Sequence, residues 1–169
     1  LKSAVRDNNP VLFCEHKFLY RRIKDEIPAG EHLVPIGKAV IRRPGKHLTI
    51  LSYGAMMHTS LEAAEALSRE GLDVEVIDLR TLLPLDEETI LESVKRTNKV
   101  MVVHEDTRTG GIAGEIAAIL CEKAFGHLDG PVFRVTSLDT PVPYAPTLED
   151  AFLPNAQKVF AAAKELARY

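Results

Sequence analysis

The densest group of reactive side chains is His104, Glu105 and Asp106, which are followed by Gly110 and Gly111. An imidazole beside two carboxylates is typical of acid–base chemistry or of a metal site. Consecutive residues on an extended segment point to opposite sides, however, so these three side chains are not expected to converge on one ion. We therefore interpret His104 as a strand-end histidine held by a neighbouring carboxylate.

The same segment contains part of a dinucleotide-binding fingerprint. Thr109, Gly111 and Gly114 have the spacing of that motif but supply only two of its three glycines. The carboxylates just before them would repel a pyrophosphate. The sequence favours a simpler role, in which Gly110 and Gly111 make a tight turn from strand to helix and Gly114 lets the helix approach the sheet.

Signatures of a catalytic nucleophile are missing. The chain has no Gly-x-Ser-x-Gly elbow and no Walker loop, and Cys14 and Cys121 stand in apolar contexts without a histidine at a catalytic spacing. His58 follows a predicted strand but has no carboxylate near it in the sequence. The histidines interpreted as linker or surface residues are His16, His32, His47 and His127. Taken alone, these residues do not make an active site.

A proline-rich segment, residues 139–146, follows the last predicted strand, and we call it the proline strap. Pro141, Pro143 and Pro146 fix an extended path that cannot enter the interior of a sheet. Such a path suits a segment that lies across a surface, either of its own domain or of a partner.

Alternating strand and helix patterns position these segments. Helix signals are a capping box at Thr59 and Glu62, acidic residues at 86–88, an apolar face that begins at Ile112, and Asn155 as a final cap. Apolar runs predict strands at residues 11–14, 38–42, 48–53, 74–79, 100–103 and 132–135. This β-α alternation predicts an α/β fold with a mostly parallel sheet and helices on both faces.

The composition is that of an ordinary globular domain, with 169 residues, 46% hydrophobic and 27% charged. No apolar run approaches the ~18 residues of a membrane span. The net charge of −3 and the scattered basic residues argue against nucleic-acid binding. Two cysteines without metal or disulfide spacing are typical of a reduced, intracellular protein. Residues 1–7 have the pattern of an amphipathic helix without an N-terminal cap, so we expect the chain to be the C-terminal part of a longer one.

A set of motifs in fixed order resembles one family across essentially the whole chain. The sequence closely resembles the C-terminal half of the β subunit of thiamine-diphosphate-dependent 2-oxo acid dehydrogenases, the decarboxylating components of the pyruvate, branched-chain 2-oxo acid and acetoin complexes. The motifs that carry the resemblance lie at residues 9–21, 34–39, 52–56, 76–84, 103–106, 139–144 and 152–154.

The resemblance implies a three-layer sandwich around a five-stranded, mostly parallel sheet whose first strand is antiparallel, as in transketolase C-terminal domains. It implies that residues 1–20 are the end of a pyrimidine-binding domain, that residues 21–35 are a linker, and that residues 36–169 form a transketolase C-terminal-type domain.

The resemblance also implies that the parent enzyme uses thiamine diphosphate and magnesium to decarboxylate a 2-oxo acid and to transfer the acyl group to a lipoyl group. The family's activating glutamate, its proton-transfer histidine and its Gly-Asp-Gly magnesium motif have no counterpart in these residues. We therefore expect no catalytic and no cofactor-binding residue in this chain, no cofactor bound to it, and no activity from it alone. The implied location is the cytoplasm, or the mitochondrial matrix in a eukaryote.

Two sets of residues are carried over from the family by resemblance. In branched-chain members a potassium ion takes oxygen ligands from a loop that corresponds here to Ala4, Asp7 and Asn9. The alternative is that Asp7 and Asn9 only shape the turn before Pro10.

The second set concerns partners: the α subunit, a second β subunit and the subunit-binding domain of the acyltransferase core. Pro141, Pro143 and Tyr144 of the proline strap and the C-terminal Tyr169 are the candidate docking residues. The alternative for Tyr169 is that it frays or packs back on its own domain.

Two other functions remain open. One is a free-standing, non-catalytic α/β module that binds a small anion at the turn formed by residues 104–111. The other is a different transketolase-like enzyme, such as a transketolase or a deoxyxylulose phosphate synthase, although these lack the Glu-His-Lys-x-Leu-Tyr sequence found at residues 15–20.

Overall fold

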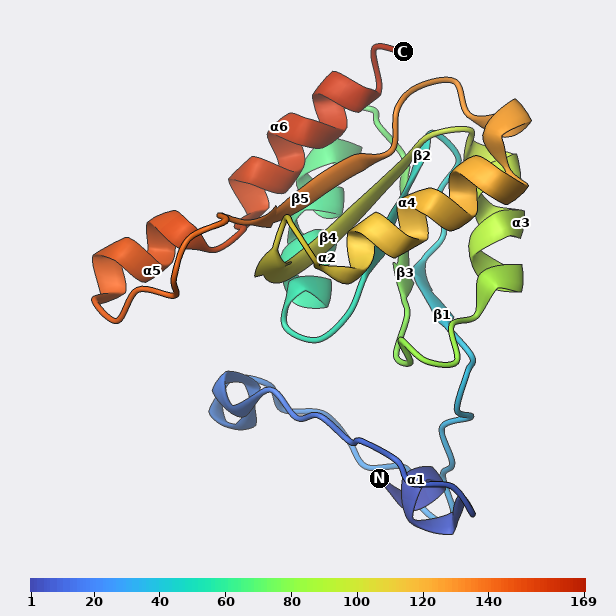
Figure 1. Ribbon diagram of the computed structural model, residues 1–169, viewed down its shortest axis with the longest axis vertical. Coiled ribbons are helices and arrows are strands. Elements are labelled where there is room, and N and C mark those ends of the chain that lie inside the picture. Colours follow the sequence, from blue (N-terminus) through green and yellow to red (C-terminus); the bar gives the residue numbers. More distant parts are fainter.

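The computed structural model describes residues 1–169, and its centre is one five-stranded sheet (Figure 1). The strands lie in the order β1-β3-β2-β4-β5. β1 pairs with β3 in antiparallel orientation, and the other three pairings are parallel. The predicted sheet is therefore confirmed. Its strands are β1 (Val40–Arg43), β2 (Leu48–Ser52), β3 (Val74–Asp78), β4 (Val100–Thr107) and β5 (Phe133–Ser137).

Helices cover both faces of this sheet, which confirms the predicted three layers. α2 and α6 pack on one face, and α3 and α4 pack on the other (Figure 1). The longest helix, α2, has 14 residues, and none has the length and apolarity needed to cross a bilayer. The helices are α1 (Lys2–Arg6), α2 (Met56–Arg69), α3 (Glu87–Thr97), α4 (Ile112–Lys123), α5 (Pro146–Phe152) and α6 (Ala156–Leu166), with 3-10 turns η1 (Lys17–Arg21) and η2 (Phe125–His127).

The two faces of each central strand supply two separate cores. Leu48 and Ile50 of β2 join the core beneath α2 and α6, whereas Leu51 joins the core beneath α3 and α4. All five residues of β2 are buried, because this strand lies between β3 and β4 and both its faces are covered. The alternation follows from the two-residue repeat of a strand.

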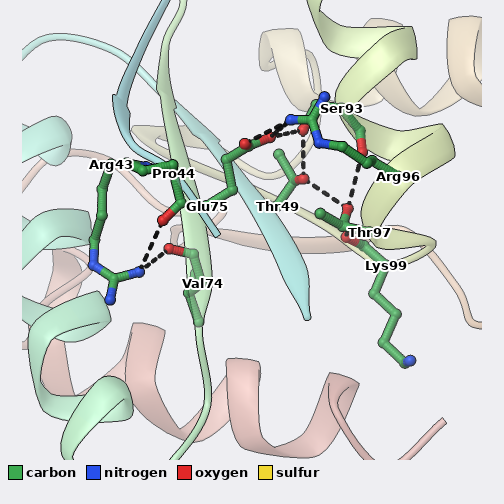
Figure 2. Close-up of polar contacts among 9 residues, drawn as sticks. All are labelled: Arg43, Pro44, Thr49, Val74, Glu75, Ser93, Arg96, Thr97 and Lys99. Carbon is green, nitrogen blue, oxygen red and sulfur yellow. Dashed lines mark hydrogen bonds and ion pairs between the residues drawn. The ribbon is translucent and has the colours of Figure 1, made fainter. Parts of the chain in front are cut away.

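Polar side chains that point into the second core form one connected network (Figure 2). Thr49 of β2 shares hydrogen bonds of 2.7 Å with the hydroxyl groups of Ser93 and Thr97 on α3. Ser93 also donates to the carboxylate of Glu75, which is only 1% exposed. Arg96 donates to both oxygens of that carboxylate, at 2.8 and 2.6 Å. The network pairs a buried charge and fixes α3 on the sheet.

The Asn155 cap of α6 and the acidic start of α3 agree with the sequence, with Asp86 as the cap itself, but the predicted cap of α2 does not. Asp86 accepts from the amide of Thr89, and Asn155 accepts from that of Lys158. The predicted capping box at Thr59 and Glu62 is wrong, because α2 already begins at Met56 and places Thr59 inside the helix.

The N-terminal segment, residues 1–36, lies mostly outside the layered body (Figure 1). The predicted strand at residues 11–14 is wrong: this stretch has irregular backbone because no strand in the chain pairs with it. The exposed fractions of Leu12 and Ile27 are 91% and 93%. Contact with the body comes through Leu19 of η1, which packs against the first core, and through His16.

Candidate functional site

A hollow of about 910 Å³ opens at the carboxyl ends of the parallel strands. Its wall includes Tyr53 after β2, the turn between β4 and α4, and Asp139 after β5. Loops that follow parallel strands emerge at the same edge of a sheet, which is where ligands gather in open α/β folds. The hollow is therefore the candidate site, and it includes most of the turn that the sequence singled out.

His104 lies beneath this turn and is fully buried. Its Nε2 accepts a long hydrogen bond, 3.4 Å, from the amide of Ala113, and its ring stacks on Tyr53 with centroids 6.2 Å apart. No carboxylate side chain hydrogen-bonds the ring, so the predicted carboxylate-held histidine is wrong. Burial lowers the pKa of His104 below its ordinary value of 6.5. The ring is a neutral structural wedge between strand and helix.

The three consecutive polar residues point apart, as the sequence predicted. His104 faces the interior, Asp106 faces the hollow, and Glu105 pairs with the Nε2 of His16 at 2.7 Å. From the sequence His16 was expected to be a linker or surface residue, but its contact with Glu105 ties the N-terminal segment to the end of β4. No spacing signal could reveal it, because the two residues are far apart in the chain.

The glycines of the turn have different roles. A Cβ on Gly111 would lie 2.5 Å from Cε1 of His104 and would also meet the carbonyl oxygen of Thr107. Gly110 has a φ of +82°, which a residue with a side chain rarely adopts. The tight turn is confirmed for both. The predicted helix–sheet approach at Gly114 is wrong: its Cα faces the hollow, where the nearest atom to a Cβ would be Nη1 of Arg134 at 4.0 Å.

A pair of hydrogen bonds that the sequence did not reveal joins the turn to the proline strap. Thr109 donates to the two carboxylate oxygens of Asp139, from its amide at 2.9 Å and from its hydroxyl at 2.8 Å. The bond from the Thr109 amide is the main cause that lowers the pKa of Asp139. Asp139 is therefore an ionised anchor between the β4 and β5 loops.

The residues carried over for potassium lie on the N-terminal segment. Ala4 is in α1, and the Oδ1 of Asp7 accepts from the amide and the side chain of Asn9 at 2.8 and 2.9 Å. The bond from the Asn9 amide lowers the pKa of Asp7. These bonds are those of a turn before Pro10, the alternative role of Asp7 and Asn9. No group of three or more His, Cys, Asp or Glu side chains in the chain is placed to hold a metal ion.

The candidate docking residues are exposed to different degrees. Tyr144 is 101% exposed, Pro141 is exposed and Pro143 is half-buried, so the proline strap does not lie across its own domain. The strap leads to α5, which projects from the body (Figure 1). Tyr169 packs edge-on against Phe133, with ring centroids 6.3 Å apart, yet is 60% exposed.

The order of strands, the antiparallel first strand and the layers agree with a match to a known family model. Residues 37–159 match the model of the transketolase C-terminal domain. The chain belongs to this family. The matched residues include all five strands and lie within the 36–169 segment expected to form such a domain.

This transketolase C-terminal domain and the residues before it are similar to curated β subunits. The chain is 49% identical over 170 residues to the 2-oxoisovalerate dehydrogenase subunit beta of Bacillus subtilis (strain 168), which covers 100% of this chain and 52% of that protein. It is 44% identical over 169 residues to the mitochondrial pyruvate dehydrogenase E1 component subunit beta of Dictyostelium discoideum, with 98% and 48% covered. The chain thus spans about half the length of the curated relatives it matches.

A solved structure shares the fold. The structure described as "Split gene transketolase, inactive beta4 tetramer" matches with a TM-score of 0.72 and 28% identity, over 85% of this chain and 46% of that one. The three-dimensional fold therefore agrees with the family assigned from the sequence.

The packing of Gly111 on His104 predicts the effect of adding one methyl group. Gly111 has φ −69° and ψ 154°, which alanine adopts freely, so Gly111→Ala tests steric contact alone. We expect it to lower the free energy of unfolding by ~1–3 kcal/mol in urea titrations, because the ring has no room to move. Gly126→Ala is the matched control, since its Cβ would meet nothing within 4 Å. Equal stability of both variants would contradict the wedge role of His104.

The buried imidazole predicts a pH dependence. The pKa of His104 is about 6.5 in the unfolded chain and lower in the folded protein. At a pH between these two pKa values the unfolded state therefore binds more protons than the folded state. The free energy of unfolding should therefore fall as the pH falls through and below about 6.5. His104→Gln should flatten this fall in urea titrations across that range, and His32→Gln, at an exposed position, should not. An unchanged slope in His104→Gln would contradict the assignment.

Proposed function

We propose that this chain is the C-terminal part of the β subunit of a thiamine-diphosphate-dependent 2-oxo acid dehydrogenase, in its decarboxylating component. One observation carries the proposal: identities of 42–49% extend over 97–100% of the chain in β subunits of the branched-chain, acetoin and pyruvate enzymes. The similarity therefore includes the N-terminal segment, which lies outside the match to the transketolase C-terminal domain.

In this proposal the parent enzyme decarboxylates a 2-oxo acid and transfers the acyl group to a lipoyl group, with thiamine diphosphate and magnesium held by residues outside this chain. The reactive side chains of this chain already make structural contacts, which supports a catalytic site outside it. His104 is a buried wedge, Glu105 pairs with His16, and Asp139 accepts two hydrogen bonds from Thr109. We assign no catalytic or cofactor-binding residue to this chain and expect no activity from it alone.

The role proposed for these residues is assembly with the α subunit, a second β subunit and the acyltransferase core. Fully exposed apolar side chains support it: Leu12 and Ile27 on the N-terminal segment and Tyr144 on the proline strap are 91%, 93% and 101% exposed. Exposed apolar surface is a common mark of protein contacts. Pro141, Pro143 and Tyr169 are proposed to belong to the same docking surfaces.

The potassium site at Ala4, Asp7 and Asn9 belongs to the proposal only for a parent enzyme that acts on branched-chain 2-oxo acids. The ionised Asp7 and nearby carbonyl groups are the oxygen donors that a hard cation prefers, and further ligands would come from elsewhere in the protein. The proposed location, cytoplasm or mitochondrial matrix, follows that of the enzyme complex. The free-standing anion-binding module has weaker support, because close relatives match the entire chain as half of a longer subunit.

The proposal predicts a defined activity. The complete protein, co-purified with its α subunit and supplied with thiamine diphosphate and magnesium, should reduce 2,6-dichlorophenolindophenol with pyruvate, 2-oxoisovalerate or acetoin. Comparing kcat/KM for the three substrates would identify the type of enzyme. A complex that forms but turns over none of them would contradict the enzymatic part, and failure to bind an α subunit would contradict the whole proposal.

The proposed assembly role predicts the effect of a change in the proline strap. Tyr144→Ser should weaken subunit association by about tenfold or more, since exposed tyrosines are frequent hot spots of interfaces. Light scattering over a dilution series measures the association, and circular dichroism checks the fold. Phe125→Ser is the matched control, because Phe125 is 73% exposed but lies on η2, away from the strap. Association of the Tyr144→Ser variant at wild-type strength would show that the strap has no such role.

A further inference from the structure

The N-terminal segment, residues 1–36, is joined to the layered body by a single polar contact. Nε2 of His16 lies 2.7 Å from Oε1 of Glu105, and every other hydrogen bond or ion pair of residues 1–36 stays within that segment. Among residues 5–36 only His16 and Leu19 are not exposed. The segment therefore meets the layered body at one small place.

The contact joins two parts of the chain whose backbone is held in place. Glu105 lies in β4, and its carbonyl oxygen accepts from the hydroxyl of Ser137 in β5 at 2.8 Å. His16 immediately precedes η1, and its carbonyl oxygen accepts from the amide of Leu19 at 3.0 Å. Because the backbone is ordered at both residues, a bond between their side chains fixes the two parts relative to each other.

Neither side chain of the pair has another polar partner in the chain. The side chains of His16 and Glu105 are 29% and 35% exposed, so both are partly shielded from water. Nδ1 of His16 is buried and has no hydrogen-bond partner, so Nε2 makes the only polar contact of the ring. An imidazole can donate from Nε2 to a carboxylate in its neutral and in its protonated form. The contact therefore does not depend on the charge of the ring.

The covalent connection of the segment to the layered body lies at Gly37. Gly37 has a φ of +76°, and its amide donates to the hydroxyl of Thr81 at 3.1 Å. The next bond follows at once, from the amide of Ala39 to Asp86 at 2.9 Å. Residues 20–36 before this point are all exposed. Gly37 is therefore the boundary about which the segment can turn.

An ion pair within the segment joins parts of the chain on either side of His16. Arg6 and Glu31 lie 2.6 Å apart, which closes a loop that has His16 near its middle. This loop is attached to the layered body through His16 and Leu19 at one place and through the chain at Gly37. The position of His16 thus sets the position of the loop.

We propose that the His16–Glu105 contact is a positioning device, which holds the N-terminal segment at the end of β4 and, when it opens, lets the segment turn about Gly37. Without it, only the packing of Leu19 against the first core and the covalent connection remain. The device itself does not depend on the proposed function. If the segment ends a preceding domain, the same contact positions that domain, and this consequence rests on the proposed function.

The test is hydrogen exchange of the complete protein in its native assembly, followed by mass spectrometry. The amides of Leu19, Arg22 and Ile23 donate to carbonyl oxygens in and beside η1, so a peptide that covers residues 17–24 reports the opening. His16→Ala and Glu105→Ala should each raise its exchange rate about threefold to tenfold, the usual effect of losing one hydrogen bond to a charged group. The exchange of β1 should not change, because β1 lies beyond Gly37 and pairs with β3.

A double variant separates one shared contact from two independent effects. His16→Ala combined with Glu105→Ala should exchange no faster than the faster single variant, because either change alone already removes the contact. Glu70→Ala is the matched control: it removes a carboxylate that pairs with Lys164 at 2.6 Å on the layered body, and it should leave the exchange of η1 unchanged. His16→Ala tests the contact even if Glu105→Ala disturbs β4, because His16 lies outside the layered body.

Three outcomes would overturn the proposal: exchange of η1 at the wild-type rate in His16→Ala, effects of the two single variants that add up in the double variant, or equally fast exchange in Glu70→Ala. Hydrogen exchange is measured without substrate and without turnover of a 2-oxo acid. A failure of this proposal is therefore distinguishable from a failure of the proposed enzymatic function.

Discussion

Burial of the central strands on both faces is the constraint on which the rest of this structure depends. β2 and β4 have neighbours on both sides and helices above and below, so each of their inner residues must either be apolar or find a polar partner within the protein. Most are apolar and divide into two cores. Among the exceptions are Thr49 of β2 and Glu75 of the adjacent β3, and α3 supplies Ser93, Thr97 and Arg96 to satisfy them (Figure 2). The position of α3 is thus set by hydrogen bonds as well as by apolar contact.

The same parallel arrangement brings the functional residues together. Because β2, β4 and β5 end at one edge, Tyr53, the turn after β4 and Asp139 become neighbours although they are distant in the chain. His104 stabilises this edge from below and Thr109 joins two of its loops. Arg108 and Arg134 of this edge each donate a hydrogen bond to the backbone carbonyl oxygen of the other.

The segments that leave apolar side chains exposed are as informative as the packed cores. The layered body buries most of its apolar residues, whereas the N-terminal segment and the proline strap leave most of theirs in solvent. The relatives that match this chain are about twice as long, and the segment before β1 is similar to them as well. The exposed apolar side chains of the N-terminal segment and the proline strap agree with the proposal that other parts of a larger assembly cover them.

The sequence by itself determined the α/β class, the strand positions within the domain, the acidic start of α3 and the cap of α6, because these depend on local periodicity and on side chains within one helical turn. Its motifs also implied a transketolase C-terminal-type domain, which the family match over residues 37–159 confirmed. Tertiary structure alone decided the rest. α2 begins at Met56, before the predicted cap at Thr59. Residues 11–14 form no strand, because a strand requires a partner for its backbone. The partner of His104, the contact of His16 with Glu105 and the meeting of Arg108 with Arg134 join residues whose proximity depends on strand order. Strand order is a property of how the layers pack, and no local pattern encodes it.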